Sequence, residues 1–203
     1  MKSLKQHIFE KLKVGVRNYT KHTLFPETKD KLEQMIKDEI SKNGNKCSLN
    51  HIDVSKITDM SGLFFGSKFN GDISEWNVSN VTNMGGMFDS SIFNGDISDW
   101  DVSNVIYMPG MFYSSNFSGD LSKWNVSNTK FMTEMFYNCK FNGDLSNWDV
   151  SNVEWFNAMF KNSSFSGDIS TWKINPKAKG HMNNMFVRSP LKNTPPDWYY
   201  KYV

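Results

Sequence analysis

The stretch FNGDISDWDVSNV at residues 93–105 is one of five near-copies of the same segment, which recur every 24 residues along the chain. Each copy carries one tryptophan, and the five are Trp76, Trp100, Trp124, Trp148 and Trp172. A coil of this length cannot bury an apolar face by itself, so a fixed repeat of this kind indicates units that stack on one another. The spacing therefore predicts an elongated repeat structure.

The repeat extends beyond the five clear copies. Ile52 stands where a preceding tryptophan would be, and Trp198 ends a last copy that has two extra residues between Ile174 and Met182. His181 is assigned to this insertion. We expect four parts in the 203-residue chain: a basic leader at 1–22, an N-terminal capping helix at 23–46, a solenoid of six coils plus a degenerate seventh at 47–198, and a tail at 199–203.

The pattern within one coil predicts strands and a helical turn. Residues 72–76 alternate between polar and apolar side chains, as a short strand does, and residues 81–84 form a second β-branched stretch. Met84, Met87 and Phe88 then follow at the spacing of one helical or 3₁₀ turn. The expected fold is a repeat solenoid, mainly β with short helical turns.

The lead-in to the repeats contains two amphipathic segments. Residues 28–41 place Leu32, Met35, Ile36 and Ile40 on one face of a helix, which we expect to cap the first coil. Residues 2–14 have apolar side chains on one side and lysines elsewhere. This leader either docks onto a partner or a membrane surface, or is a plain flexible or locally packed extension.

Two polar positions recur along the repeats. The asparagines at Asn80, Asn104, Asn128 and Asn152 are expected to bond backbone groups at a corner of each coil. The aspartates form a second series, Asp72, Asp96, Asp120, Asp144 and Asp168. Stacked like charges are costly unless each carboxylate accepts N–H bonds in its own turn, which is the expected role, or a cation such as calcium lies between them.

Composition and charge exclude several classes of function. Residues 47–174 carry a net charge of −7 between basic ends, which argues against nucleic acid as a ligand. Cys47 and Cys139 lie too many coils apart for a disulfide and are expected to be free and buried. The four histidines are scattered, so we expect no catalytic site, no metal site and no cofactor. No apolar run is long enough to span a membrane.

Residues 93–105 and their copies resemble the BspA-like leucine-rich-repeat surface proteins, which are also described as a mycoplasma-type domain of unknown function. The resemblance covers about three quarters of the chain. It implies a right-handed, leucine-rich-repeat-like solenoid that acts in adhesion or protein binding, and related arrays occur in bacteria, protists, large viruses and phages. Because no secretory signal or wall anchor is evident, we expect an intracellular or virion-associated protein rather than a secreted one.

Aromatic side chains at two variable positions mark a candidate binding surface. The first position, seven residues after each tryptophan, holds Tyr107, Phe131 and Trp155 in consecutive coils, and the second adds Tyr113 and Tyr137. Clustered aromatic residues of this kind are typical of interfaces, although the same rings could brace an edge of the core. The resulting hypothesis is a non-enzymatic module that binds a protein or a glycan. The alternative is a structural or decoration component of a virus or phage particle that docks through its leader.

Overall fold

The computed structural model describes residues 22–203 of the chain. The apolar and basic residues of the leader, including Leu4, Ile8, Phe9 and Leu12, lie outside the described residues, so the expectations for that segment are not tested.

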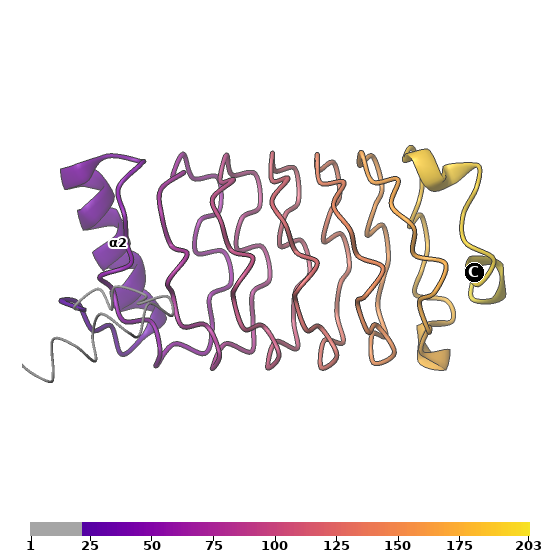
Figure 1. Ribbon diagram of the computed structural model, residues 1–203, viewed down its shortest axis with the longest axis horizontal. Coiled ribbons are helices and arrows are strands. Elements are labelled where there is room, and N and C mark those ends of the chain that lie inside the picture. Colours follow the sequence, from indigo (N-terminus) through magenta and orange to yellow (C-terminus); the bar gives the residue numbers. More distant parts are fainter. Residues whose placement is uncertain (1–21) are drawn as a thin grey trace, which may run out of the picture.

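The molecule is a row of stacked coils with a helix at one end. Figure 1 shows α2 (Lys29–Asn43) beside the first coil, a series of similar loops of chain following it along the long axis, and the C-terminal segment at the opposite end. Three 3₁₀ helices lie in the last part of the chain: η1 (Pro176–Ala178), η2 (Pro190–Lys192) and η3 (Tyr199–Lys201). The stack buries one continuous apolar core that runs from Leu32 to Trp198.

The expected β class is wrong. No β-strand is formed in residues 22–203, where extended backbone pairs only as isolated parallel bridges such as Asn83↔Tyr107 and Tyr107↔Phe131. The helical turn expected at Met84 to Phe88 is likewise absent, since these residues form non-helical turns. The description of the fold as a mainly β, right-handed, leucine-rich-repeat-like solenoid is therefore incorrect, and the coils have little regular secondary structure.

Hydrogen bonds from turn residues explain how coils stack without strands. The N–H groups of Met60, Gly62 and Phe64 each donate to a carbonyl of the next coil at 2.9 Å. Between them, the N–H of Leu63 donates back to the carbonyl of Met60 at 3.3 Å, which closes a local turn. Alternate residues thus bond along the stack while their neighbours bond within the coil, and no run of extended residues is left to form a strand.

Left-handed backbone residues produce these turns. Gly62, Gly86 and Gly110 occupy the same place in three successive coils with φ of 64°, 61° and 59°. A positive φ at the third position of a turn is the requirement of type II geometry, and glycine meets it without a steric penalty. In the next two coils the place is taken by Glu134 and Ala158, with φ of 57° and 53°. Each of these two side chains therefore holds a conformation that its residue type disfavours.

The tryptophan series lies in the core, as predicted. Trp124 is 3% exposed, and its indole Nε1 donates to the carbonyl of Ile97 in the preceding coil at 3.0 Å. Trp198 makes the equivalent bond to Ile169 at 2.9 Å, despite the two extra residues in its coil. The phenylalanines pack in a parallel column, with the rings of Phe112 and Phe136 5.7 Å apart. Each coil is thus joined to the next by packing and by a buried hydrogen bond.

The asparagine series bonds the backbone of a neighbouring coil, as predicted. The side-chain amide of Asn104 donates to the carbonyl of Ser79 at 2.7 Å, and Asn128 donates to Ser103 at the same distance. These bonds satisfy corner carbonyls along the stack.

The aspartate series closes turns within its own coils. The Asp96 carboxylate accepts the backbone N–H of Ser98 at 3.0 Å, and Asp120 accepts that of Ser122 at 2.9 Å. The hydrogen bonds from Ser98 hold the pKa of Asp96 below its usual value, because they favour the charged form. Within residues 22–203, no group of three or more His, Cys, Asp or Glu side chains is placed to hold a metal ion. The carboxylates therefore take the expected role as acceptors in their own turns.

Helix α2 packs its apolar face onto the stack. The hydroxyl of Thr28 accepts the N–H of Lys31 at 3.3 Å, Gly44 ends the helix with φ of 80°, and Leu32 and Ile36 are buried. None of the helices in the described part of the chain is long and apolar enough to cross a membrane.

The two cysteines differ in burial. Cys139 is buried and Cys47 only half-buried, so the expectation of burial is wrong for Cys47, and both thiols are free.

Candidate functional site

The three aromatic residues of the first variable position form a stack across consecutive coils. The rings of Tyr107 and Phe131 lie 4.7 Å apart with planes within 5°, and those of Phe131 and Trp155 lie 6.5 Å apart with planes within 22°. Tyr107 is 45% exposed and Trp155 36% exposed, while Phe131 is half-buried. The ring edges therefore reach solvent, while the ring faces are largely turned toward one another.

The backbone holds this stack in register. Parallel bridges join Asp59, Asn83, Tyr107, Phe131 and Trp155 in turn, so each residue of the series lies directly beside its counterpart in the next coil. The sequence had placed the series outside the core but gave no indication that its backbone carries the bridges. Because the positions of the backbones are fixed, the rings are held at a spacing close to the distance between coils.

His181 is the fourth member of the stack, and sequence reasoning missed it. Its ring centroid lies 3.6 Å from that of Trp155. Its carbonyl accepts the N–H of Phe156 at 2.8 Å, as the carbonyl of Trp155 accepts the N–H of Met132 at 2.9 Å. The assignment of His181 to the insertion is therefore wrong. The signal was present, because His181 immediately precedes Met182 as Trp155 immediately precedes Phe156.

The tyrosines of the second variable position form a separate, shorter stack. The rings of Tyr113 and Tyr137 lie 4.6 Å apart with planes within 6°. The ammonium Nζ of Lys161, in the following coil, lies 5.6 Å from the centroid of the Tyr137 ring, within the range of a cation–π interaction. The hydroxyl of Tyr137 also accepts a bond from the side-chain amide of Asn162 at 3.0 Å.

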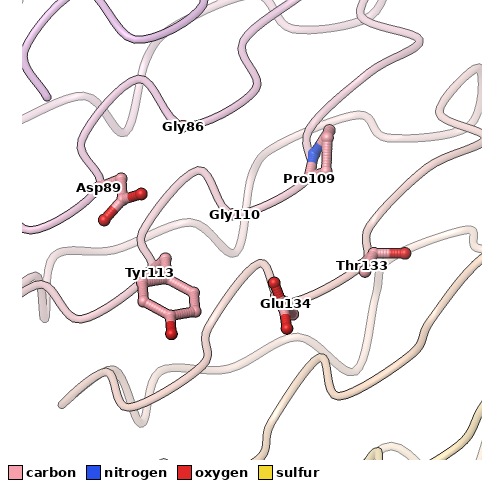
Figure 2. A pocket seen from close by; sticks show the side chains of 7 residues that line it. All are labelled: Gly86, Asp89, Pro109, Gly110, Tyr113, Thr133 and Glu134. Carbon is pink, nitrogen blue, oxygen red and sulfur yellow. The ribbon is translucent and has the colours of Figure 1, made fainter.

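A shallow pocket of about 320 Å³ lies beside Tyr113 of the second stack. Figure 2 shows the side chains around it, and its lining is Gly86, Asp89, Pro109, Gly110, Tyr113, Thr133 and Glu134. Three successive coils contribute to the lining, and the middle one carries a residue of each stack. There, Tyr107 lies two residues before Pro109, and Tyr113 lies three residues after Gly110. The lining contains two carboxylates, those of Asp89 and Glu134, and no basic side chain.

The two carboxylates lie close enough to Tyr113 to affect its pKa. Burial, the neighbouring Tyr137, and the carboxylates of Glu134 and Asp89 together raise the pKa of Tyr113. The shift favours the neutral phenol. Sequence reasoning had included Tyr113 in the variable series but missed Glu134. The sequence did contain a sign of Glu134, because it stands where the glycine series Gly62, Gly86 and Gly110 would place the next glycine.

Comparison with family models identifies the chain. The model described as Mycoplasma protein of unknown function, DUF285, matches residues 30–140 and 114–198. The chain belongs to this family. The two matches together cover α2 from Asp30 onward and the coils, including both aromatic stacks of this DUF285 protein. No curated protein and no solved structure matches the chain.

Proposed function

We propose that this DUF285 protein is a non-enzymatic binding module whose stacked aromatic residues contact a protein partner. The observation that carries the proposal is the row formed by Tyr107, Phe131 and Trp155, whose part-exposed rings are held side by side by bridges between coils. Aromatic residues dominate the energetics of protein interfaces, where they bury large areas.

The orientation of the rings favours a protein partner over a glycan. A sugar packs flat against the face of an aromatic ring, but here Tyr107 and Phe131 cover each other's faces at 4.7 Å. The outer face of Trp155 is covered by His181, whose ring centroid lies 3.6 Å away. The ring edges, the Tyr107 hydroxyl and the face of Tyr107 turned away from Phe131 remain for contact, and a protein surface supplies both the apolar groups and the hydrogen-bond partners that suit them.

Rigidity of the rings adds to this argument. A free aromatic side chain loses rotamer freedom when it is buried in an interface, and this loss weakens binding. In this protein the rings are already fixed by stacking on their neighbours, with planes of Tyr107 and Phe131 within 5°. Preorganised rings of this kind bind at a lower entropic cost.

The likeness of residues 93–105 to BspA-like surface proteins supports the same class of role. We take from that likeness only the binding of another protein. The strand-rich architecture of those proteins is not carried over, because residues 22–203 form no strand.

Partner capture from a native cell extract tests the proposal. We expect capture by the full chain to be lost in a Tyr107→Ala, Phe131→Ala, Trp155→Ala triple variant and to survive deletion of residues 1–22. Loss through the deletion alone, with capture intact in the triple variant, would show that the protein docks through its leader as a structural component instead.

A second variant separates binding from folding. Asn83 occupies the same position as the aromatic residues in an earlier coil, where its side-chain oxygen accepts the N–H of Gly85 at 3.0 Å. A Phe131→Asn, Trp155→Asn double variant therefore introduces asparagine, the residue that an earlier coil already has at this position. We expect it to remain folded, with some loss of stability because its ring contacts are removed, and to lose capture; capture at wild-type strength by the folded variant would contradict the proposal.

A further inference from the structure

The two ends of the tyrosine stack have different surroundings. One face of Tyr137 carries Tyr113 at 4.6 Å, and the Nζ of Lys161 lies 5.6 Å from the same ring on the side of the following coil. The face of Tyr113 that is turned away from Tyr137 looks toward the preceding coil, where Asp89 holds the same position in the repeat. A cation thus lies at one end of the stack and a carboxylate at the other.

The pocket beside Tyr113 exists because two glycines leave space. Gly86 and Gly110 line it, and a Cβ atom added to either would meet no atom closer than 3.7 Å. Glu134, which follows them in the series, brings a carboxylate to the same pocket and keeps a left-handed φ of 57° to do so. Within residues 22–203, no hydrogen bond or ion pair involves that carboxylate, whereas Asp89 accepts a bond from the hydroxyl of Ser90 at 2.7 Å.

We propose that this pocket receives an arginine side chain of the protein partner. The guanidinium group would lie against the open face of Tyr113 and donate to the carboxylates of Asp89 and Glu134 (Figure 2). The proposal rests on the proposed function, because it names the chemistry that the partner presents beside the aromatic stack.

Charge and shape both select this occupant. The pocket combines two carboxylates with an aromatic ring and has no basic residue in its lining. Lys161 on Tyr137 shows that the same tyrosine stack already accepts a cation within the protein. Arginine suits the pocket better than lysine, because its planar group stacks on a ring while its N–H groups donate in the plane to acceptors on either side.

Titration with a small probe tests the pocket directly. The full chain, labelled with ¹⁵N, is titrated with N-acetyl-arginine amide, and the amide signals of Gly110 and Glu134 are followed by NMR. N-acetyl-citrulline amide is the matched neutral probe, because it has nearly the same shape without the charge. We expect saturable shifts with the arginine probe, a dissociation constant in the millimolar range typical of a single side chain, and no saturation with citrulline. Equal shifts with both probes would overturn the proposal.

Three variants locate the binding. We expect Asp89→Asn with Glu134→Gln to weaken the arginine probe at least about 10-fold, since the charged hydrogen bonds are lost. Gly110→Asn should weaken binding of the probe by a similar factor, because the new side chain fills the pocket. The backbone tolerates asparagine at this place, since Asn184 holds the same left-handed conformation in a later coil with φ of 62°. Glu33→Gln on α2 is the control and should leave binding unchanged. Unchanged binding in either pocket variant contradicts the proposal.

This titration is independent of partner capture. The arginine probe tests the pocket alone, whereas the Phe131→Asn, Trp155→Asn variant tests the aromatic stack alone. The failure of the pocket proposal and the failure of the proposed function are therefore distinguishable.

Discussion

The imidazole ring of His181 lies on the indole ring of Trp155, with the two centroids 3.6 Å apart and the planes inclined by 27°. This contact ends the aromatic stack at the last coil and covers a face of Trp155 that would otherwise meet solvent. We expect His181→Ala to lower the free energy of unfolding by about 1 kcal/mol, the usual value of an aromatic pair. His181→Tyr keeps a ring at that position and should restore stability in urea denaturation. Equal stability of the alanine variant and the wild type would show that the contact contributes nothing.

Trp124 tests the contribution of the buried tryptophan series. We expect Trp124→Ala to cost about 3 to 5 kcal/mol, because a buried ring is lost and a cavity remains. Trp124→Phe keeps part of the volume but removes the indole donor to Ile97, and it should cost clearly less. Chemical denaturation measures both. An alanine variant as stable as the wild type would place Trp124 outside the core.

Glu134 is predicted to trade stability for binding. Its φ of 57° disfavours any residue with a Cβ, and glycine holds the same place in three earlier coils. We expect Glu134→Gly to raise the free energy of unfolding by up to about 1 kcal/mol, since relief of the left-handed strain exceeds the entropic cost of glycine. The same variant should bind the arginine probe more weakly. Loss of stability on thermal denaturation would show that the Glu134 side chain itself supports the fold.

The aspartate series makes stability depend on pH in the acid range. Hydrogen bonds from Ser98 and Ser122 hold the pKa values of Asp96 and Asp120 below the usual value of 3.8. Stability from a lowered pKa is present above the unfolded pKa and is lost as the pH falls through the folded one, so we expect the loss below about pH 4. Asp96→Asn keeps an acceptor for Ser98 and should unfold with a shallower pH dependence. An identical acid profile would rule out this role for Asp96.

The sequence was sufficient to predict the parts of the fold that depend on side-chain pattern. Trp124 and its counterparts had to be buried because a large apolar residue recurs at every step, and Asn104 had to bond a corner because it recurs with them. Both contacts are found. The stacking of Tyr107 on Phe131 follows from the same spacing, since equal positions in successive coils lie side by side.

The backbone between these positions could not be predicted in the same way. Residues 81–84 have the β-branched composition of a strand, yet only Asn83 forms a bridge there. The following turn depends on positive φ values at Gly86 and Ser90, and serine gives no sign in the sequence that it will adopt one. Whether alternate N–H groups bond along the stack or within the coil is decided by the neighbouring coils, which a local pattern does not describe. The pocket was missed for the same reason.

Site-specific photo-crosslinking tests the central claim, that the aromatic stack contacts a protein partner. A benzophenone amino acid is placed at Phe131, where an aromatic ring is already present, and at Lys123, an exposed position immediately before Trp124 and outside both aromatic series, as the control. In native cell extract we predict a discrete protein adduct from position 131 that excess unlabelled wild-type protein suppresses, and no such adduct from position 123. An adduct of equal yield from both positions, or from position 123 alone, would contradict the account.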